Sequence, residues 1–481
     1  MTSFSKLFGS NQSQATLDFV DVDPDADIPL FFDPYVFEDI SDPFFAKCHV
    51  AIKSFFDRLL FLVRANDERK AKEILSYLQE PNELCFGLSS GRPSGRGIGR
   101  GQAEDMYESF SQSEAAKSGL LTDLAECELF VTGIGPDKIS DIAANIIRRH
   151  LITYTQQQCE LHGFPLTAGV PSGPLWDEAQ LRWTQTYVEL PVAKGRPIIL
   201  VPKKLVRWRG DLSHQHKKYY DHFVLNFLKD QHLNSGGRFV HILKDGSPRV
   251  YKTELKEAPQ YELSKDFLFR FSRDNPTVLA QYQEAYRLTK GVEVSELEEN
   301  FDESTFVDTL KRKLKSIPAG TKDANKYHRL MIGILEYLFY PNLAYPVPEQ
   351  NINEGRKRID IVYTNTAKSG FWSRIASHHD IPSQYIMVEC KNYQSDVANP
   401  EFDQLVGRFS ANRGRVGILL SRSIDDLDRY LARCKDVTNQ SNGYVLALVD
   451  SDIDLLLDYA SSYRRSQIDE YLENRFRNLL M

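Results

Sequence analysis

An ordered succession of helical and strand-like segments in the last third of the chain constrains its fold more than any other feature. The succession follows an acidic, polar break at residues 292–304. Its members are helical patterns at 306–317 and 325–340, strand patterns at 356–363 and 384–393, a helical pattern at 400–414, and buried-strand patterns at 415–421 and 444–450. Helices that alternate with short apolar strands predict an α/β fold, with helices packed against a mixed sheet.

The length of 481 residues predicts two or three domains, at about 150 residues each. With 42% hydrophobic and 26% charged residues, the composition is that of an ordinary globular protein. We expect a flexible acidic tail at 1–27, a mainly helical α+β region at 28–300, and the α/β domain at 301–481. The middle region would recognise, regulate or oligomerise, and it is long enough for two subdomains.

Several classes of protein are excluded by what the sequence lacks. No run of 18 apolar residues is present, and the N-terminus lacks a basic segment followed by an apolar one. The six cysteines are scattered, and none forms a C-x-x-C pair. We therefore expect a cytoplasmic protein with no membrane contact. The phosphate-binding pattern G-x-x-x-x-G-K-[ST] is absent, so we expect no ATP site in this chain.

The net charge of −7 does not indicate a nucleic-acid-binding protein, but the charge is distributed unevenly. Residues 194–252 contain 13 Lys or Arg and 4 Asp, which gives a local charge of +9. Histidine and aromatic side chains are mixed into this basic segment, a composition that suits phosphate contacts and base stacking. The alternative interpretation is the solvated surface of a helical domain.

Charged residues interrupt two of the strand patterns. Asp360 lies between Ile359 and Ile361, and Glu389 and Lys391 interrupt an apolar run. Side chains two residues apart on a strand share a face, so Glu389 and Lys391 project together. A buried carboxylate is costly unless it is paired or bound to a metal, so these residues form a candidate site.

The residue types of this candidate site favour metal-assisted hydrolysis of phosphodiesters. Two carboxylates on neighbouring strands can hold a hard cation through oxygen. A nearby lysine can orient a water molecule or stabilise the charge that develops on phosphorus. The alternative is that Glu389 and Lys391 form an ordinary ion pair at a strand end, while Asp360 pairs with a cation close to it in the sequence.

Asp360 followed by Glu389-Cys390-Lys391 resembles the PD-(D/E)XK nuclease superfamily, over residues 305–455. The resemblance implies a restriction-endonuclease-like mixed-sheet core flanked by helices. It also implies that Asp360 and Glu389 bind the metal and that Lys391 is the catalytic lysine. The implied cofactor is Mg²⁺, for which Mn²⁺ is expected to substitute.

The same resemblance assigns roles to two further polar residues. Glu336, in the helical pattern before the strands, matches the position of an auxiliary catalytic acid. Gln404, in the helical pattern after Lys391, matches a polar position that faces the site. One departure is that Ile359, rather than proline, precedes Asp360.

Six basic residues close to the motif in sequence are candidates for guiding a phosphate backbone into the site. They are Arg356, Lys357, Arg358, Arg408, Arg413 and Arg415. For the last three, a solvated helix end is the alternative interpretation, because cations also suit the dipole there.

Together these features predict a metal-dependent endonuclease. Double-stranded DNA is the expected substrate, and RNA is a less favoured one. The architecture, a large region fused to such a domain, is typical of bacterial restriction or anti-phage defence effectors, and a homo-oligomer would suit cutting of both strands. The alternative hypothesis is a non-catalytic nucleic-acid-binding or scaffold protein that retains the nuclease-like fold.

Overall fold

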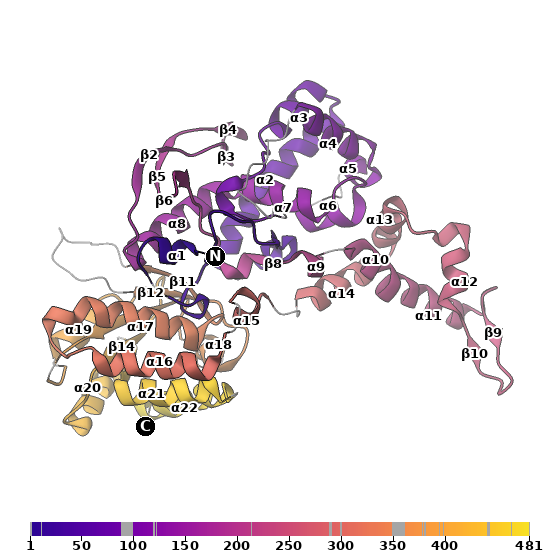
Figure 1. The fold of residues 1–481 in the computed structure, drawn as a ribbon. Coiled ribbons are helices and arrows are strands. Elements are labelled where there is room, and N and C mark those ends of the chain that lie inside the picture. Colours follow the sequence, from indigo (N-terminus) through magenta and orange to yellow (C-terminus); the bar gives the residue numbers. More distant parts are fainter. Residues whose placement is uncertain are drawn as a thin grey trace.

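The computed structural model shows a mixed helix-and-sheet protein, which confirms the general α/β prediction (Figure 1). It describes residues 2–10, 12–87, 100–118, 121, 123–212, 214–287, 291–298, 301–348, 361–377, 379, 381–393, 395–397, 399–439, 443–462 and 464–480. No described helix combines the length and the apolar composition that a membrane span requires.

Two hydrophobic cores organise the described residues. The first is built almost entirely from residues 4–292, and the second almost entirely from residues 307–479. Each core also receives residues from the other part of the chain: Ala344 and Tyr345 pack in the first, and Ala15 and Leu161 pack in the second. The two parts are therefore joined through their interiors as well as through the connecting chain.

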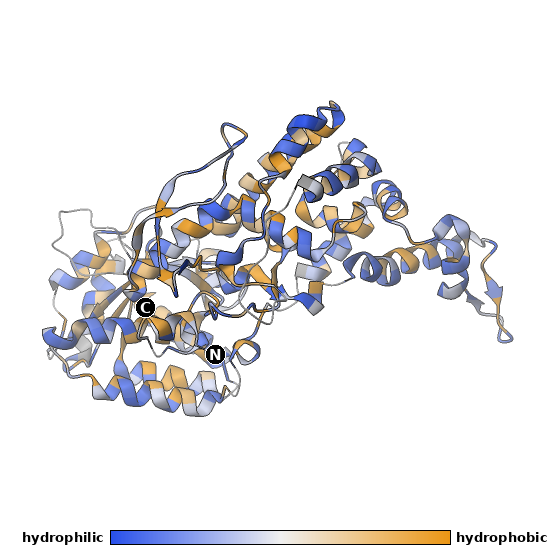
Figure 2. Ribbon diagram, turned by 45° about the horizontal axis from the view of Figure 1, so that its top comes forward, coloured by the Kyte–Doolittle hydropathy of each residue, from blue (hydrophilic) through white to orange (hydrophobic). Residues whose placement is uncertain are grey.

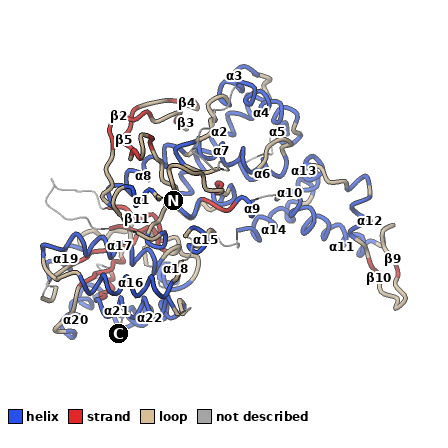
Figure 3. The backbone as a smooth tube through the Cα atoms, viewed as in Figure 1, coloured by secondary structure: helices blue, strands red, loops and turns tan. Residues whose placement is uncertain are grey.

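Helices dominate the first part (Figure 3). They are α1 (Phe4–Leu7), α2 (Pro43–Arg64), α3 (Glu68–Leu75), α4 (Arg100–Gln112), α5 (Glu114–Ser118), α6 (Leu124–Phe130), α7 (Pro136–Ile146) and α8 (Arg148–His162). The longest, α2, begins where the Asp42 side chain accepts hydrogen bonds from the Phe44 and Phe45 amides. Its buried residues recur at helical spacing. Figure 2 shows the resulting mixture of polar and apolar residues along the long helices.

Short antiparallel strand pairs connect these helices. The pairs are β1 (Leu30–Phe32) with β8 (Val206–Trp208), β2 (Thr167–Pro171) with β5 (Tyr187–Leu190), β3 (Leu175–Asp177) with β4 (Arg182–Thr184), and β6 (Val192–Ala193) with β7 (Arg196–Pro197). The β1–β8 pair matters most for the architecture, because it ties the N-terminal segment to a strand almost 180 residues later in the chain.

After β8 the chain forms an arm that extends to one side of the molecule (Figure 1). The arm contains α9 (Arg209–Leu212), α10 (Gln215–Tyr219), a π-helical turn (Tyr220–Val224), α11 (Leu225–Ser235), α12 (Lys252–Glu257), α13 (Lys265–Asp274) and α14 (Pro276–Arg287). A hairpin of β9 (His241–Ile242) and β10 (Pro248–Arg249) lies at its far end, and α15 (Val294–Leu297) follows the arm.

The acidic N-terminal segment is not the flexible tail that its composition predicts. Phe4, Leu17 and Phe19 are fully buried, and Phe19 forms a bridge with Pro202. The apolar residues between the acids are sufficient to anchor the segment in the first core. One of the acids, Asp25, also finds a counter-charge in the basic segment at 194–252.

Ion pairs between the first 42 residues and the basic segment at 194–252 use cations that the sequence made candidates for binding nucleic acid. Lys194 pairs with Asp25, Arg207 with the fully buried Asp33, and Lys204 with Asp42 at 2.8 Å. A share of the local positive charge is therefore neutralised within the protein.

The second part is a five-stranded mixed sheet in the order β11-β12-β13-β14-β15. The strands are β11 (Leu343–Pro348), β12 (Ile361–Asn365), β13 (Tyr385–Lys391), β14 (Val416–Ser421) and β15 (Tyr444–Val449). β11, β12 and β13 are antiparallel neighbours, whereas β13, β14 and β15 are parallel. Parallel strands require helical crossovers, and α19 and α20 supply them.

Helices cover both faces of this sheet. They are α16 (Glu303–Ser316), α17 (Ala324–Phe339), α18 (Gly370–Ser377), α19 (Asn399–Val406), α20 (Leu427–Asn439), α21 (Asp450–Ser461) and α22 (Ser466–Leu480). α16, α17 and α21 contact one another on one side, while α19, α20 and α22 pack on the other, where α18 contacts α22. The central strand β13 is thereby enclosed on both faces.

Candidate functional site

The candidate site is centred on the carboxylate of Glu389, on the central strand β13. Glu389 and Lys391 lie on the same face of the strand, as their spacing predicts. α19 covers this face: Gly417 is in register with Met387, and a Cβ on Gly417 would meet the side chains of Leu405 and Phe409 at 3.1 Å. The Glu389 side chain is only 2% exposed.

Two cations hold the Glu389 carboxylate. Lys391 Nζ contacts its Oε1 atom, and Arg408 Nη1 donates to its Oε2 atom at 2.7 Å. The Lys391 and Arg408 side chains are 11% and 12% exposed, so this edge of the cluster reaches the surface. The cations offset the cost of burying the carboxylate. The three side chains together carry a formal charge of +1, which suits an anionic ligand such as a phosphate.

Of the other residues expected at the site, Gln404 lies close by in sequence on the helix that precedes Arg408. Gln404 is half-buried on α19, which ends at Val406, two residues before Arg408. The described contacts do not include a hydrogen bond between Gln404 and Glu389.

Arg413 and Arg415 are exposed and lie at the other end of the strand. The Tyr385 amide donates to the Arg413 carbonyl at 3.1 Å, which places this turn at the first residue of β13. Four residues of strand, about 13 Å, separate Tyr385 from Glu389. Of the three arginines after the motif, the structure therefore brings Arg408 alone to the candidate site.

Four of the expected site residues lie outside the described residues. They are Asp360, Arg356, Lys357 and Arg358. Ile361, the residue that follows Asp360, is the first residue of β12 and pairs with Val388. The described part of β12 thus begins opposite Val388, the residue that precedes Glu389 on β13.

Glu336 is placed elsewhere than the resemblance implies. It lies near the end of α17, 1% exposed, and pairs with Lys203 Nζ at 3.3 Å. His328, on the same helix, contacts the Cys390 carbonyl at 2.6 Å, and eight residues of helix, about 12 Å, separate it from Glu336. The structure therefore gives Glu336 a partner of its own and does not bring it to Glu389.

Glu336 belongs to a buried charged junction, which we define as Asp18, Lys203 and Glu336. Burial raises the pKa of Glu336 to about 8; Lys203 opposes this rise, and Asp18 adds to it. Burial also raises the pKa of Asp18, although the Tyr154 hydroxyl donates to its Oδ2 atom at 2.7 Å. Within the described residues, Glu336 Oε2 has no hydrogen-bond partner.

The buried junction connects the two cores. Asp18 comes from the N-terminal segment, Lys203 from the chain just before β8, and Glu336 from the second part. Lys203 Nζ also lies 4.1 Å from the ring centroid of Tyr340. The sequence offered the same signal as for Glu389, a charged residue within an apolar run, at Asp18 and at Lys203.

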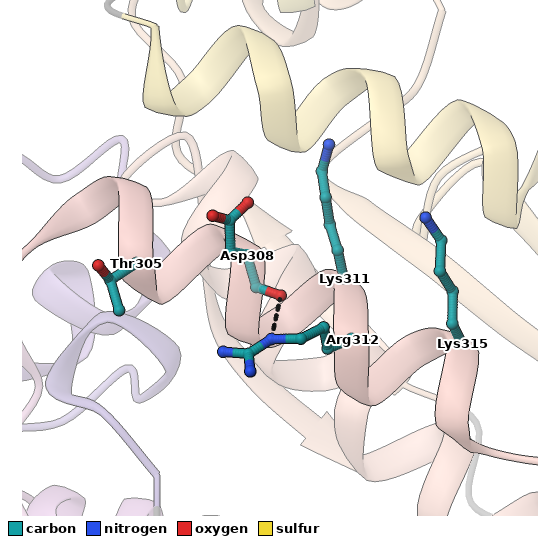
Figure 4. A pocket seen from close by; sticks show the side chains of 5 residues that line it. All are labelled: Thr305, Asp308, Lys311, Arg312 and Lys315. Atoms are coloured by element: carbon teal, nitrogen blue, oxygen red, sulfur yellow. Dashed lines mark hydrogen bonds between the residues drawn. The ribbon is translucent and has the colours of Figure 1, made fainter.

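A shallow hollow of about 330 Å³ lies along α16 (Figure 4). Its lining residues all come from this one helix, and Arg312 Nε donates to the Asp308 carbonyl at 3.3 Å. Lys311 and Lys315 point toward α21, where they pair with Asp458 and Asp454. Because these cations already pair with α21, the hollow is part of the packing between two helices.

Metal ligands are sparse among the residues that the structure describes. In that part of the chain, no group of three or more His, Cys, Asp or Glu side chains is arranged to hold a metal ion. Glu389 supplies one hard oxygen donor group, and a Mg²⁺ site is commonly built from one or two carboxylates together with water and substrate phosphate oxygens. The donor chemistry at Glu389 fits such an ion.

Comparisons with known proteins cover only parts of the chain. Residues 9–213 match a family described as a domain of unknown function (DUF8370). This match includes Asp18 and Lys203 and ends before Glu389. The chain is also 24% identical over 147 residues to a putative transposon gamma-delta 80.3 kDa protein of Escherichia coli (strain K12). That similarity covers 30% of this chain and 20% of the relative's length, and no solved structure matches.

Proposed function

We propose that the second part of the chain is a divalent-metal-dependent nuclease of the PD-(D/E)XK type. The observation that carries the proposal is the pairing of a buried carboxylate with a lysine two residues later on one face of the central strand. β12, which begins directly after Asp360, is the hydrogen-bonded neighbour of that strand. Acidic and E-x-K elements on neighbouring central strands are what the resemblance implies.

In this proposal each residue of the site has one task. Asp360 and Glu389 hold the metal through carboxylate oxygens, and Lys391 orients the attacking water and stabilises charge on the phosphate. Bound Mg²⁺ would polarise the phosphate and lower the pKa of a coordinated water.

Arg408 is the residue that must change partner when the substrate enters. Its guanidinium donates to Glu389 Oε2, one of the two oxygens of a carboxylate that would hold the metal. A guanidinium binds phosphate as well as carboxylate, so an incoming phosphodiester can take Arg408 and release Glu389. The positively charged edge of the cluster would thus bind DNA first. Glu389, once released by Arg408, would then be able to bind the metal.

The direct test is digestion of supercoiled plasmid DNA in Mg²⁺ or Mn²⁺. We expect the wild type to nick or linearise the plasmid, and Asp360→Ala and Lys391→Ala to lose activity by about 10²-fold or more. The control is Lys311→Ala, which removes a lysine on α16 that pairs with Asp458 on α21. This variant should cleave as the wild type does. Nicking that persists unchanged in both site variants would exclude the proposed site. Competition with single-stranded DNA and RNA would establish which nucleic acid is preferred.

One observation favours a second function, that of a nucleic-acid-binding or scaffold protein that retains the fold without catalysis. Both oxygens of Glu389 already have cationic partners, Lys391 and Arg408, as an ordinary structural ion pair would. The same digestion separates the two functions. Binding to DNA that survives while no cleavage appears with any divalent metal would favour the scaffold.

A role in restriction or anti-phage defence is proposed from architecture alone. The transposon protein of E. coli shares only a fraction of its length with this chain, and its name states no activity. Expression of the protein in a bacterial host should lower phage plaque formation, and Lys391→Ala should restore it. Equal plaque numbers with and without the protein, across a panel of phages, would remove this role.

A further inference from the structure

A pocket of about 460 Å³ is lined by residues that include members of α9, α10 and α14. These helices lie at the root of the arm (Figure 1). We call this pocket the root pocket and define it by Arg207, Lys218, His222, Phe223, Tyr282 and Tyr286. Its volume falls within the range of small-molecule sites, which is about 300–1,000 Å³. The pocket is far from Glu389 in sequence, and the candidate nuclease site uses none of its residues.

Aromatic side chains form one wall of the root pocket, and a hydrogen-bonded network holds them in place. Tyr35 donates from its hydroxyl to the Tyr282 hydroxyl at 3.2 Å, and Tyr282 donates to Gln215 Oε1 at 2.7 Å. Gln215 is fully buried. The Phe223 ring lies 5.4 Å from the Tyr282 ring, and the Tyr286 ring lies 4.2 Å from the Tyr35 ring. Such a wall is rigid before any ligand arrives, which lowers the entropic cost of binding a flat ring.

The lining of the root pocket also includes the basic residues Arg207, Lys218 and His222. Lys218 and His222 are exposed at the rim, and Arg207 lies deeper, 5.3 Å from the Tyr286 ring centroid. Arg207 is fixed by its pairing with Asp33, which keeps the guanidinium beside the aromatic wall. Asp211 is the acidic residue among those that line the pocket. With histidine neutral, the lining carries a formal charge of +1 in a chain of net charge −7.

The backbone at this pocket is also unusual. His222 and Phe223 are presented by the π-helical turn at Tyr220–Val224, which interrupts the regular helix between α10 and α11. Such turns are rare and occur frequently at functional sites, because the extra residue redirects neighbouring side chains. Here the redirected side chains are one cationic or hydrogen-bonding group and one aromatic ring, both in the pocket lining.

We propose that the root pocket binds a free nucleotide, with its base against Phe223, Tyr282 and Tyr286 and its phosphate toward Lys218 and His222. The aromatic wall provides stacking, and the basic rim provides charge-assisted hydrogen bonds to phosphate oxygens. The bounded volume suits one nucleotide rather than a polymer. Arg207 lies on β8, outside the arm, whereas the other residues that define the root pocket lie within the arm. A nucleotide that fills the pocket would therefore contact both parts. The proposal does not rest on the nuclease activity.

The test is calorimetric titration of the full-length protein, without metal, with the four nucleoside 5′-monophosphates, adenosine and inorganic phosphate. We expect at least one nucleotide to bind, and both adenosine and phosphate alone to bind at least about tenfold more weakly. Lys218→Glu and Phe223→Ala should each weaken the nucleotide by about tenfold or more. Lys229→Glu makes the same charge change on α11, outside the pocket lining, and should leave the affinity unchanged.

Three results would overturn the proposal. The first is the absence of binding heat for every nucleotide at about 1 mM, a concentration that detects weak complexes. The second is wild-type affinity in both Lys218→Glu and Phe223→Ala, with thermal unfolding showing that the variants are folded. The third is a single-stranded oligonucleotide that displaces the mononucleotide and binds more tightly, which would make the pocket part of a polymer-binding surface.

Discussion

Two buried glutamates in this protein share a sequence signal but differ in their surroundings. Glu389 and Glu336 both interrupt apolar runs, and both are almost inaccessible to solvent. Glu389 is held by two cations, whereas Glu336 is held by one and has an acid, Asp18, close enough to raise its pKa further. A buried carboxylate with excess positive charge is prepared for an anionic ligand. One with excess negative charge has a raised pKa, and here it packs between the two cores.

The difference teaches that burial of an acid in an apolar element identifies a costly site without identifying its use. The cations around the acid decide that use, and they come from different parts of the chain at the two sites. Lys203 reaches Glu336 from the first part, while Lys391 and Arg408 reach Glu389 from its own strand and from the chain after α19. Four changes would test this distinction.

The largest effect is expected when Lys203 is removed from the buried junction. Lys203→Ala removes the cation that pairs with Glu336 and that lowers the pKa of the buried Asp18, so the free energy of unfolding should fall by about 3–5 kcal/mol. Chemical denaturation followed by circular dichroism measures this loss. Lys217→Ala, at an exposed position of α10, is the matched control and should change stability little. A loss below about 1 kcal/mol in Lys203→Ala would show that the junction does not depend on its cation.

The contact between the N-terminal segment and α17 should be the next most sensitive. An ideal Cβ on Gly333 would lie 3.0 Å from Cβ and 3.2 Å from Cγ2 of Thr16. Gly333→Ala should therefore cost about 1–3 kcal/mol through overpacking. It should also expose residues near Thr16 to limited proteolysis. Adding Thr16→Gly to the Gly333→Ala variant removes the clashing side chain and should restore resistance to proteolysis. A double variant that is still cleaved near residue 16 would contradict the account.

The pH dependence of stability should reveal the retained proton of Glu336. The pKa of Glu336 is raised to about 8 in the folded protein, so unfolding between its ordinary pKa of 4.5 and 8 releases a proton. Stability should consequently fall as pH rises through this window, by up to about 1.4 kcal/mol per pH unit. Glu336→Gln lacks the titrating group and should show a shallower decline. Identical pH profiles for the two proteins would mean that Glu336 is ionised when folded.

The smallest effect is expected from the arginines at the far end of β13. Arg413→Ala and Arg415→Ala should change plasmid cleavage by less than about threefold, because single exposed charges contribute little and these lie about four strand residues from Glu389. Arg408→Ala, measured beside them, should lose about tenfold or more. If all three variants lost the same cleavage activity, the site would have to include both ends of β13.

The sequence anticipated the sheet domain better than the first part, for physical reasons. Strand runs at 384–393 and 415–421 are mostly apolar because β13 and β14 are buried on both faces. β11 escaped prediction because Pro346 and Pro348 lie within it, and an edge strand tolerates proline. The helix predicted at 400–414 ends at Val406 instead. Gly407 follows at once, and the backbone of Arg413 and Arg415 joins the strand ends.

The N-terminal segment shows the limit of composition. Its acids suggest a solvated tail at 1–27, yet Asp25 pairs with Lys194, and just beyond the segment Asp33 and Asp42 are buried against Arg207 and Lys204. Such pairing depends on residues more than 160 positions apart, and no local pattern encodes it. The same holds for Glu336, whose helix position matched a family role although its partner, Lys203, lies in the other part of the chain.

The most direct test of the account compares Glu389→Gln with Glu336→Gln in one plasmid-cleavage assay with Mg²⁺. Each change keeps the size of a buried side chain and removes its charge. The account predicts that Glu389→Gln loses cleavage by about 10²-fold or more, while Glu336→Gln cleaves within about threefold of the wild type at a pH where it is folded. Equal cleavage by Glu389→Gln and the wild type, or a loss confined to Glu336→Gln, would contradict it.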